Sequence, residues 1–435
     1  MIVLVEPLCQ EMSHEKVNSG FIYGLQLAFP GEMIRMYAHA THIKAIKNVF
    51  VIDGIATKNI EYIPIKFDTS ESVFAFIGYY FLLKRILKET IVLSVDKIFF
   101  LSFSPPMLFL IKKLKSRRFF SKLKFTFVLH AAFEGIDEEN IFVPTKVVSH
   151  SKPVGFGDRM KKISFKKIPE IPSKLLGVLG RPISRRFEKI VTISRRIFNG
   201  MFPIKKMLLF CSSPDYRYVA LAPYIREKAK AYIDVEQIEI FSVYLPTVFV
   251  NPLPNPKNSY PKFAIFGYGN SGLLQQLNFA LLKKNIKSKF EIRIIGSDSR
   301  GTEVFGHVTT PIRGRRLTRI EMESLVVDID FILILYEKGR YRLSCSASIM
   351  ESLSYMKPIV HLDNDCINFF NSKERPIGIQ CVDVDQMADE MASMIENFSS
   401  YSDRILDFRK NISLVRENVK IENSVTSLTK SFTWN

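Results

Sequence analysis

The sequence predicts an α/β protein of two tandem Rossmann-like domains, with a deep cleft between them and a helical C-terminal tail. Three observations lead to this prediction. The chain has 435 residues, enough for two domains. Strand-like runs alternate with helix-like runs in each half. A segment with five prolines, residues 244–262, separates the halves as a linker would. We place the N-terminal domain at residues 1–245, the second domain at 246–400 and the tail at 401–435.

In the first half, apolar and β-branched runs predict six strands, at residues 1–7, 33–40, 60–67, 97–103, 124–130 and 189–194. Helical spacing predicts helices at residues 18–28, from residue 41, at 71–88 and at 106–115. Residues 136–188 are basic and rich in proline and glycine, so we expect loops and a short helix there.

In the second half, strands are predicted at residues 263–267, 290–296, 331–336, 358–362 and 377–384. The run FILILY at 331–336 has no polar residue before its last position, as in a central parallel strand buried on both faces. Helices are expected at 273–284, at 318–327 and from 344 onward. The second of these opens with Thr318-x-x-Glu321, the pattern of a capping box. The tail is expected to be mostly helical.

The composition restricts the class of protein. A hydrophobic content of 47% supports packed cores and excludes wholesale disorder. The five cysteines are scattered without a CxxC pair, which indicates a reducing compartment and no structural zinc. The longest apolar runs, at 73–83 and 99–111, fall short of the ~20 residues that span a bilayer. The opening MIVLVEP reads as a strand and not as a secretory signal, so we expect a cytoplasmic protein.

The formal net charge of +18 implies an anionic partner. Basic residues concentrate in KKLKSRRFFSKLK (112–124) and RMKKISFKK (159–167), interleaved with Phe, Leu and Ile. This mixture suits an anionic membrane surface, where cations meet headgroups and apolar side chains insert. A solvated basic face is the alternative. We do not expect nucleic acid as a partner, because no recognised nucleic-acid-binding motif accompanies the charge.

Small and polar residues open the helix expected from residue 344. Ser344, Ser346 and Ser348 would let an anion approach the free backbone N–H groups and the positive dipole end of the helix. Glu351 is spaced to share a helical face with Ser344 and Ser348. Its carboxylate would then accept hydrogen bonds from two vicinal hydroxyls, such as those of a ribose. The alternative is a capping box, Ser348-x-x-Glu351, with no role in binding.

A second glycine-rich pattern, GYGNSG at residues 267–272, follows a predicted strand and precedes a helix. It matches G-x-G-x-x-G through Gly267 and Gly269, with Asn270 next to them. Such a loop would lie against phosphates, and on its own it also fits a dinucleotide-binding oxidoreductase.

The stretch YEKGRYRLSCSASIMESLSYMKPIV, residues 336–360, resembles the donor-binding segment of GT-B glycosyltransferases. Two Rossmann-like halves, a proline-rich linker and a helical tail that could cross back match the same architecture. The resemblance implies that the loop at 267–270 closes over the donor phosphates and that Arg342 neutralises the diphosphate leaving group. Many retaining members have a second acid eight positions before the helical one. That position here is Leu343, so the stereochemical outcome is left open.

In the first half, His14 lies in the long polar loop after the first strand, His130 at a strand tip and Glu134 in the loop beyond. The resemblance places both loops against the acceptor and the sugar. Activation of an acceptor hydroxyl requires a histidine or an acid. We expect His130 to be this base and Glu134 to orient it, with His14 as a further candidate. A structural hydrogen bond is the alternative role for His130.

We therefore predict a glycosyltransferase that moves a sugar from a nucleotide-sugar donor, UDP-sugar favoured, to a lipid-linked glycan. The context is bacterial surface polysaccharide (O-antigen or capsule) or lipopolysaccharide biosynthesis on the inner membrane. No cofactor is expected. No metal is expected either, since three scattered D-x-D pairs suggest chance. The alternatives are an NAD-dependent oxidoreductase using residues 267–272 and a non-catalytic, basic membrane-binding scaffold with a degenerate GT-B fold.

Overall fold

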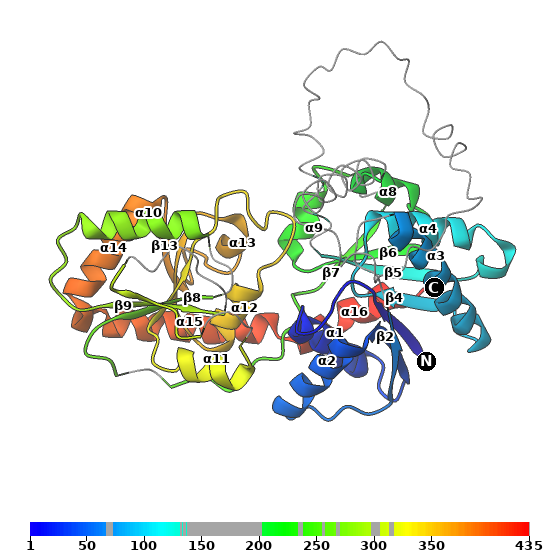
Figure 1. The fold of residues 1–435 in the computed structure, drawn as a ribbon, viewed down its shortest axis with the longest axis horizontal. Coiled ribbons are helices and arrows are strands. Elements are labelled where there is room, and N and C mark those ends of the chain that lie inside the picture. Colours follow the sequence, from blue (N-terminus) through cyan, green and yellow to red (C-terminus); the bar gives the residue numbers. More distant parts are fainter. Residues whose placement is uncertain are drawn as a thin grey trace, which may run out of the picture.

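The computed structural model describes residues 1–434 except 67–72, 131–132, 134–135, 137–201, 234–237, 255–256, 267–269, 297–304 and 313–316. The chain forms two lobes, each built on one sheet, and both termini lie at the first lobe (Figure 1). The predicted fold class, two Rossmann-like domains followed by a helical C-terminal segment, is confirmed.

The first sheet has the strand order β3-β2-β1-β4-β5-β6-β7, and all of its paired strands are parallel. Its strands are β1 (Ile2–Glu6), β2 (Ile34–His39), β3 (Ile60–Ile65), β4 (Lys97–Phe100), β5 (Lys124–Leu129), β6 (Tyr216–Ala220) and β7 (Glu239–Ser242). The first five match predicted strands within a few residues. Strands β6 and β7 were not predicted from the sequence, and the strand predicted at 189–194 lies outside the described residues.

The helices of the first domain are α1 (Glu15–Ala28), α2 (Ala40–Ile52), α3 (Val73–Val92), α4 (Pro105–Lys115), the short η1 (Arg118–Phe120), α8 (Ile204–Phe210) and α9 (Pro223–Ala229). Four of them, α1 to α4, match predicted helices to within four residues at the ends that were given. Helix α1 begins three residues earlier than predicted, which brings Lys16 into its first turn. The sequence analysis did not include α8 and α9.

The second sheet has the order β10-β9-β8-β11-β12-β13 and is also parallel. Its strands are β8 (Lys262–Phe266), β9 (Glu291–Ile295), β10 (Val308–Thr309), β11 (Phe331–Ile334), β12 (Ile359–Leu362) and β13 (Gly378–Cys381). All but the two-residue β10 were predicted. Strand β11 is fully buried: Phe331 and Leu333 join the core under α10 and α14, whereas Ile332 and Ile334 join the core that continues into the first domain.

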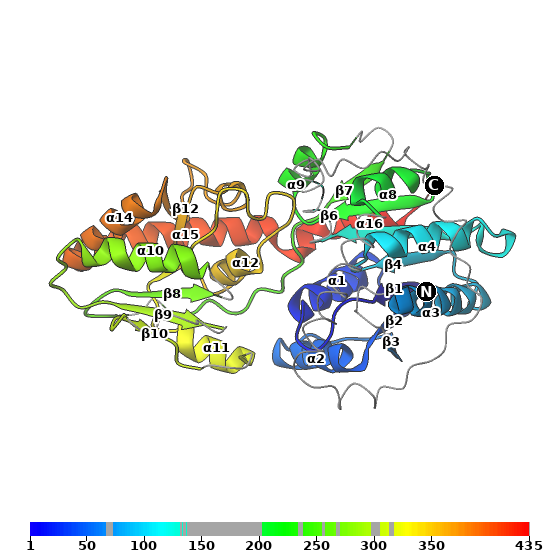
Figure 2. The ribbon, with the colours of Figure 1, turned by 45° about the horizontal axis from the view of Figure 1, so that its top comes forward.

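The helices of the second domain are α10 (Ser271–Leu282), α11 (Arg319–Val326), α12 (Ala347–Ser354), α13 (Asp365–Asn368) and α14 (Val384–Glu396). Helix α11 has the predicted capping box, in which Thr318 and Glu321 satisfy each other's backbone N–H groups. Helices α10 and α14 pack together on one side of the sheet, and α11 lies on the other (Figure 2).

The strand order reverses between β1 and β4 in the first sheet and between β8 and β11 in the second. Ligands of such sheets bind beyond the carboxyl ends of the strands at these reversal points. A ligand-binding site is therefore expected at the loops after β1 and β4 and at those after β8 and β11. No helix among the described residues is long and apolar enough to cross a bilayer.

The C-terminal segment runs from the second domain back to the first. Helix α15 (Ser402–Val419) lies along the second domain, and after η5 (Ile421–Ser424), α16 (Val425–Phe432) packs on α1 (Figure 2). The Thr126 hydroxyl donates to the Ser431 carbonyl oxygen at 2.9 Å. Gly24 of α1 permits this closeness, since a Cβ there would meet Leu428 and Ile421 of the tail, whereas Gly20 lets the linker approach, since a Cβ there would lie 2.5 Å from the Pro246 carbonyl oxygen. The tail thus holds the two domains together.

Candidate active site

A buried hydrogen-bond network shapes the loop after β1. Glu6, at the end of β1, is 1% exposed, and its carboxylate accepts the backbone N–H groups of Leu8 at 3.0 Å and Cys9 at 3.1 Å. The Asn18 amide donates to the same carboxylate at 3.0 Å and lies 2.8 Å from the His42 ring nitrogen Nε2. A buried carboxylate with this many donors fixes the surrounding backbone. The network therefore holds the loop that carries His14.

The structure brings the two predicted histidines together. The rings of His14 and His130 lie 4.3 Å apart between centroids, in an edge-to-face arrangement. His14 is exposed and has a left-handed backbone, with φ of 56°. This is uncommon for a non-glycine residue and a reason to suspect function. Burial, together with the charge of His14, lowers the pKa of His130 to about 3, so its imidazole is neutral at physiological pH. Glu134 lies outside the described residues.

The start of α12 differs from the prediction. The helix begins at Ala347 with Ser346 as its N-cap, three residues later than expected. Ser344 therefore lies before the helix, and the prediction that it shares a helical face with Ser348 and Glu351 is wrong. Its carbonyl oxygen accepts a hydrogen bond from the Tyr224 hydroxyl. Ser346 is fully buried, and its hydroxyl lies 2.7 Å from the Tyr336 hydroxyl. The contacts with these two tyrosines therefore hold Ser344 and Ser346 outside the helix.

Two other predicted donor-binding residues, Asn270 and Arg342, follow the carboxyl ends of β8 and β11 in the second sheet. Asn270 caps α10 by accepting the Leu273 N–H at 3.1 Å, and its amide donates to Glu337 at 2.8 Å. This contact ties the loop after β8 to the loop after β11. Arg342 is exposed, and its guanidinium lies 5.5 Å from the Tyr232 ring centroid of the first domain. Gly267 and Gly269 lie outside the described residues.

Glu351 forms an ion pair that the sequence analysis missed. Its Oε1 lies 2.7 Å from the Nζ of Lys16, in the first turn of α1. The capping-box alternative is therefore wrong, because Glu351 faces another domain and Ser348 lies inside the helix. Burial disfavours the Lys16 ammonium, but the nearby Glu351 carboxylate outweighs this effect and raises the pKa of Lys16 above its usual range. The sequence signal that could have indicated a role for Lys16 is its place at the start of a helix, directly after a long polar loop.

Further contacts join the two domains near this pair. Arg319 of α11 forms an ion pair with Asp53, which caps α2, and Lys228 of α9 forms one with Asp365 of α13. The Tyr224 ring lies 5.1 Å from that of Phe369. The carboxyl edges of the two sheets therefore face each other across contacts made by α1, α9, α11 and α12.

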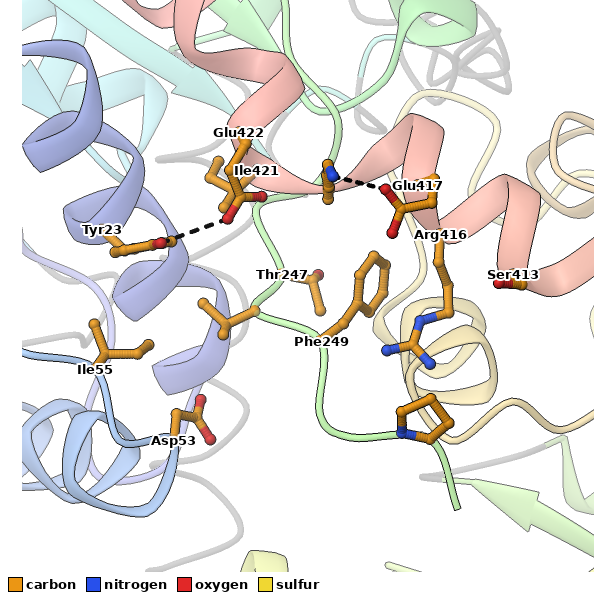
Figure 3. Close-up of a pocket in the computed structure, with 13 residues that line it drawn as sticks. Tyr23, Asp53, Ile55, Thr247, Phe249, Ser413, Arg416, Glu417, Ile421 and Glu422 are labelled. Atoms are coloured by element: carbon orange, nitrogen blue, oxygen red, sulfur yellow. Dashed lines mark hydrogen bonds and ion pairs between the residues drawn. The ribbon is translucent and has the colours of Figure 1, made fainter. Parts of the chain in front are cut away.

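A pocket of about 500 Å³ lies elsewhere, between the first domain, the linker and α15 (Figure 3). Tyr23 of α1 donates to Glu422 at 3.4 Å on one side. On the other, the Arg416 guanidinium lies 5.0 Å from the Phe249 ring centroid and donates to the Val250 carbonyl oxygen at 2.7 Å. Tyr23 is about two turns along α1 from its start. This pocket is thus a feature of the interdomain junction and is separate from the edge that carries the histidines.

A basic and aromatic surface lies on α3 and the turn η1, and we call it the α3–η1 surface. It carries Phe81 and Phe119, which are 63% and 59% exposed, together with the exposed Arg117 and Arg118. The Arg117 guanidinium lies 5.7 Å from the Tyr80 ring centroid, so both elements contribute to one patch.

Not every basic residue of the 112–124 stretch is available to a partner. Lys115 is buried and donates to the carbonyl oxygens of Ser121 and Leu123 at 2.6 and 2.5 Å. Lys115 therefore has a structural role, because its ammonium satisfies these two carbonyl oxygens. The stretch at 159–167 lies outside the described residues.

The D-x-D pair at the start of β11 is occupied by structural contacts. Asp328 forms ion pairs with Lys262 at 2.6 Å and Arg293 at 2.7 Å. Asp330 accepts the Lys262 backbone N–H at 2.8 Å. Both acids lie at the amino end of the strand, away from the carboxyl edge. In the part of the chain that the structure describes, no cluster of three His, Cys, Asp or Glu side chains could hold a metal ion.

Comparison with solved structures gives matches along nearly the whole chain. A glycosyltransferase from Rickettsia africae is 12% identical, with 99% of this chain and 96% of that chain covered and a TM-score of 0.56. The lipopolysaccharide outer core galactosyltransferase WaaB, in its apo form, is 14% identical, with 98% of each chain covered and a TM-score of 0.55. The chain has the GT-B fold.

A third match is Anabaena Alr3699/HepE in complex with UDP-glucose, 9% identical, with 99% of this chain and 98% of that chain covered and a TM-score of 0.50. No family model and no curated protein matches the sequence. At these identities the likeness establishes the GT-B fold, and the chemistry rests on the residues described above.

Proposed function

We propose that the protein is a glycosyltransferase that uses a nucleotide-sugar donor. The observation that carries the proposal is the position of Glu351. It lies on α12, the helix that follows the carboxyl end of β11 at the reversal point of the second sheet, and it faces the first domain. A carboxylate there accepts ribose hydroxyls, and the positive end of α12 attracts the diphosphate. Three GT-B structures similar to this chain are described as glycosyltransferases or hold UDP-glucose.

The chemistry on the acceptor side is assigned to the histidine pair. The acceptor hydroxyl oxygen bonds to the anomeric carbon, the bond from that carbon to the phosphate oxygen breaks, and the electron pair leaves with the nucleoside diphosphate. The hydroxyl proton passes to an imidazole. With a pKa near 3, His130 is a weak base. We assign the proton to the exposed His14, with His130 as its neutral neighbour and no metal required.

The acceptor proposed here is a lipid-linked glycan, which places the enzyme on the inner face of a bacterial membrane, in surface polysaccharide assembly. The support is the α3–η1 surface. Exposed guanidinium groups beside exposed phenyl rings suit anionic headgroups above an acyl boundary.

Nucleotide binding tests the donor proposal. We expect UDP to raise the melting temperature, and free UDP at 100 times its dissociation constant to add ~2.7 kcal/mol to the free energy of unfolding. The measurement is a thermal shift series with UDP, GDP, CMP and NAD. Stabilisation by NAD alone would favour an oxidoreductase using residues 267–272. Stabilisation by none of the four would contradict nucleotide-sugar transfer and favour the scaffold.

Vesicle binding tests the membrane proposal. We expect the protein to sediment with anionic vesicles, and less so as salt screens charges beyond ~10 Å at 0.1 M. Replacing Arg117 and Arg118 by serine should cost about 2 kcal/mol, roughly 30-fold in partitioning. The matched control replaces Lys283 and Lys287, which are exposed on the second domain, by serine. It should bind anionic vesicles as the wild type does. Equal partitioning of both double variants would place the contact elsewhere.

A further inference from the structure

Lys16 is a cation that the structure places beside Glu351 of the candidate donor site. Its ammonium lies 2.7 Å from Glu351, and the two side chains are partly exposed, by 34% and 23%. The pair joins the first turn of α1 to α12 and is therefore a contact between the two domains. A partly exposed ion pair contributes little to the stability of the fold. We therefore look for a role of this pair in ligand binding.

Two arginines in the loop after β11 contact aromatic rings. The Arg340 guanidinium lies 5.0 Å from the Tyr341 ring centroid, and Arg342 contacts Tyr232. Both are exposed. Lys16 is instead partly enclosed, next to the carboxylate to which the ribose is assigned. A ribose that donates two hydrogen bonds to Glu351 competes with the Lys16 ammonium for the same oxygens.

The anion site and the carboxylate are close enough for one lysine to serve both. Glu351 is five residues beyond the N-cap Ser346, which is ~7.5 Å along the helix at 1.5 Å per residue. The lysine stem has four carbons with rotatable bonds, and its ammonium donates in three directions. Rotation about these bonds can carry the ammonium away from the carboxylate by a distance of this order.

We propose that Lys16 exchanges partners when the donor binds. It pairs with Glu351 in the empty site and with the diphosphate of a nucleoside diphosphate sugar in the occupied one. This inference rests on the proposed function and adds a specificity determinant to it. Lys16 then selects diphosphates over nucleosides, and because it belongs to the first domain, it couples donor binding to the approach of the two domains.

The test compares uridine, UMP and UDP by isothermal titration against the wild type and Lys16→Met. We expect the variant to bind UDP at least tenfold more weakly. It should bind uridine as well as the wild type or better, because the competing ammonium is gone. Lys16→Arg should restore part of the preference for UDP. Lys44→Met, an exposed change on α2, is the matched control and should bind all three ligands as the wild type does.

The outcomes separate this inference from the proposed function. If UDP binds the wild type and Lys16→Met loses affinity for uridine and UDP equally, or for neither, the partner exchange is wrong and the donor proposal stands. If the wild type binds none of the uridine ligands, and none of the corresponding guanosine and cytidine ligands, both proposals fail. Circular dichroism and melting temperature establish that each variant is folded.

Discussion

Glu351→Ala should eliminate sugar transfer while the protein stays folded. The carboxylate is assigned two hydrogen bonds from the donor ribose, and hydrogen bonds to charged groups contribute about 1.5–3 kcal/mol each. Their loss corresponds to at least about a 10²-fold loss of nucleotide affinity. The fold should tolerate the change, because Glu351 is partly exposed and Lys16, its partner, can reach solvent. The measurement is nucleotide release with donor and acceptor, together with titration of UDP.

Two further variants sharpen this result. Glu351→Gln keeps the size of the side chain but removes its charge, so it should lie between the wild type and Glu351→Ala in uridine affinity. Glu374→Ala removes an exposed acid before β13 and should transfer sugar at the wild-type rate. Wild-type turnover by a folded Glu351→Ala protein would mean that this carboxylate binds only Lys16, and the donor site would have to be sought elsewhere.

His14→Ala should lower turnover by about 10²–10⁴-fold with little change in donor affinity, as expected for the loss of a general base. His14 is exposed and held in a left-handed conformation beside His130, so an acceptor hydroxyl can approach it from solvent. The measurement is steady-state kinetics with nucleotide release as the readout. A group that only positions the acceptor would change the Michaelis constant instead.

Variants at the neighbouring positions distinguish the roles within the pair. His130→Phe keeps a ring against His14 but cannot titrate, and we expect a smaller loss of turnover than for His14→Ala. Glu134→Ala tests whether that acid orients either imidazole. A larger loss at His130 than at His14 would restore His130 as the base. Near-native turnover in all three variants would make Glu11, which lies with His14 in the loop after β1, the next candidate for the base.

The sequence alone predicted most of the fold because local patterns were strong. The fully apolar β11 and the Thr318–Glu321 capping box each follow from a few adjacent residues. Strands β6 and β7 were missed because their local patterns are weak. Arg217 interrupts the apolar run of β6, and β7 is a four-residue edge strand. The alternation of Tyr216, Tyr218 and Ala220 was the signal that could have identified β6.

For the candidate site, the sequence alone identifies which residues are suited to the chemistry: an acid inside α12, and histidines after β1 and β5. Their contacts become visible only in the folded chain. Tyr224 and Tyr336 fix the start of α12, and His14 meets His130. Lys16 reaches Glu351 across 335 positions of sequence. Helix and strand periodicity reports which face of an element is buried, but a contact between two polar side chains on different domains leaves no periodic trace, because it depends on how the finished sheets are placed against each other.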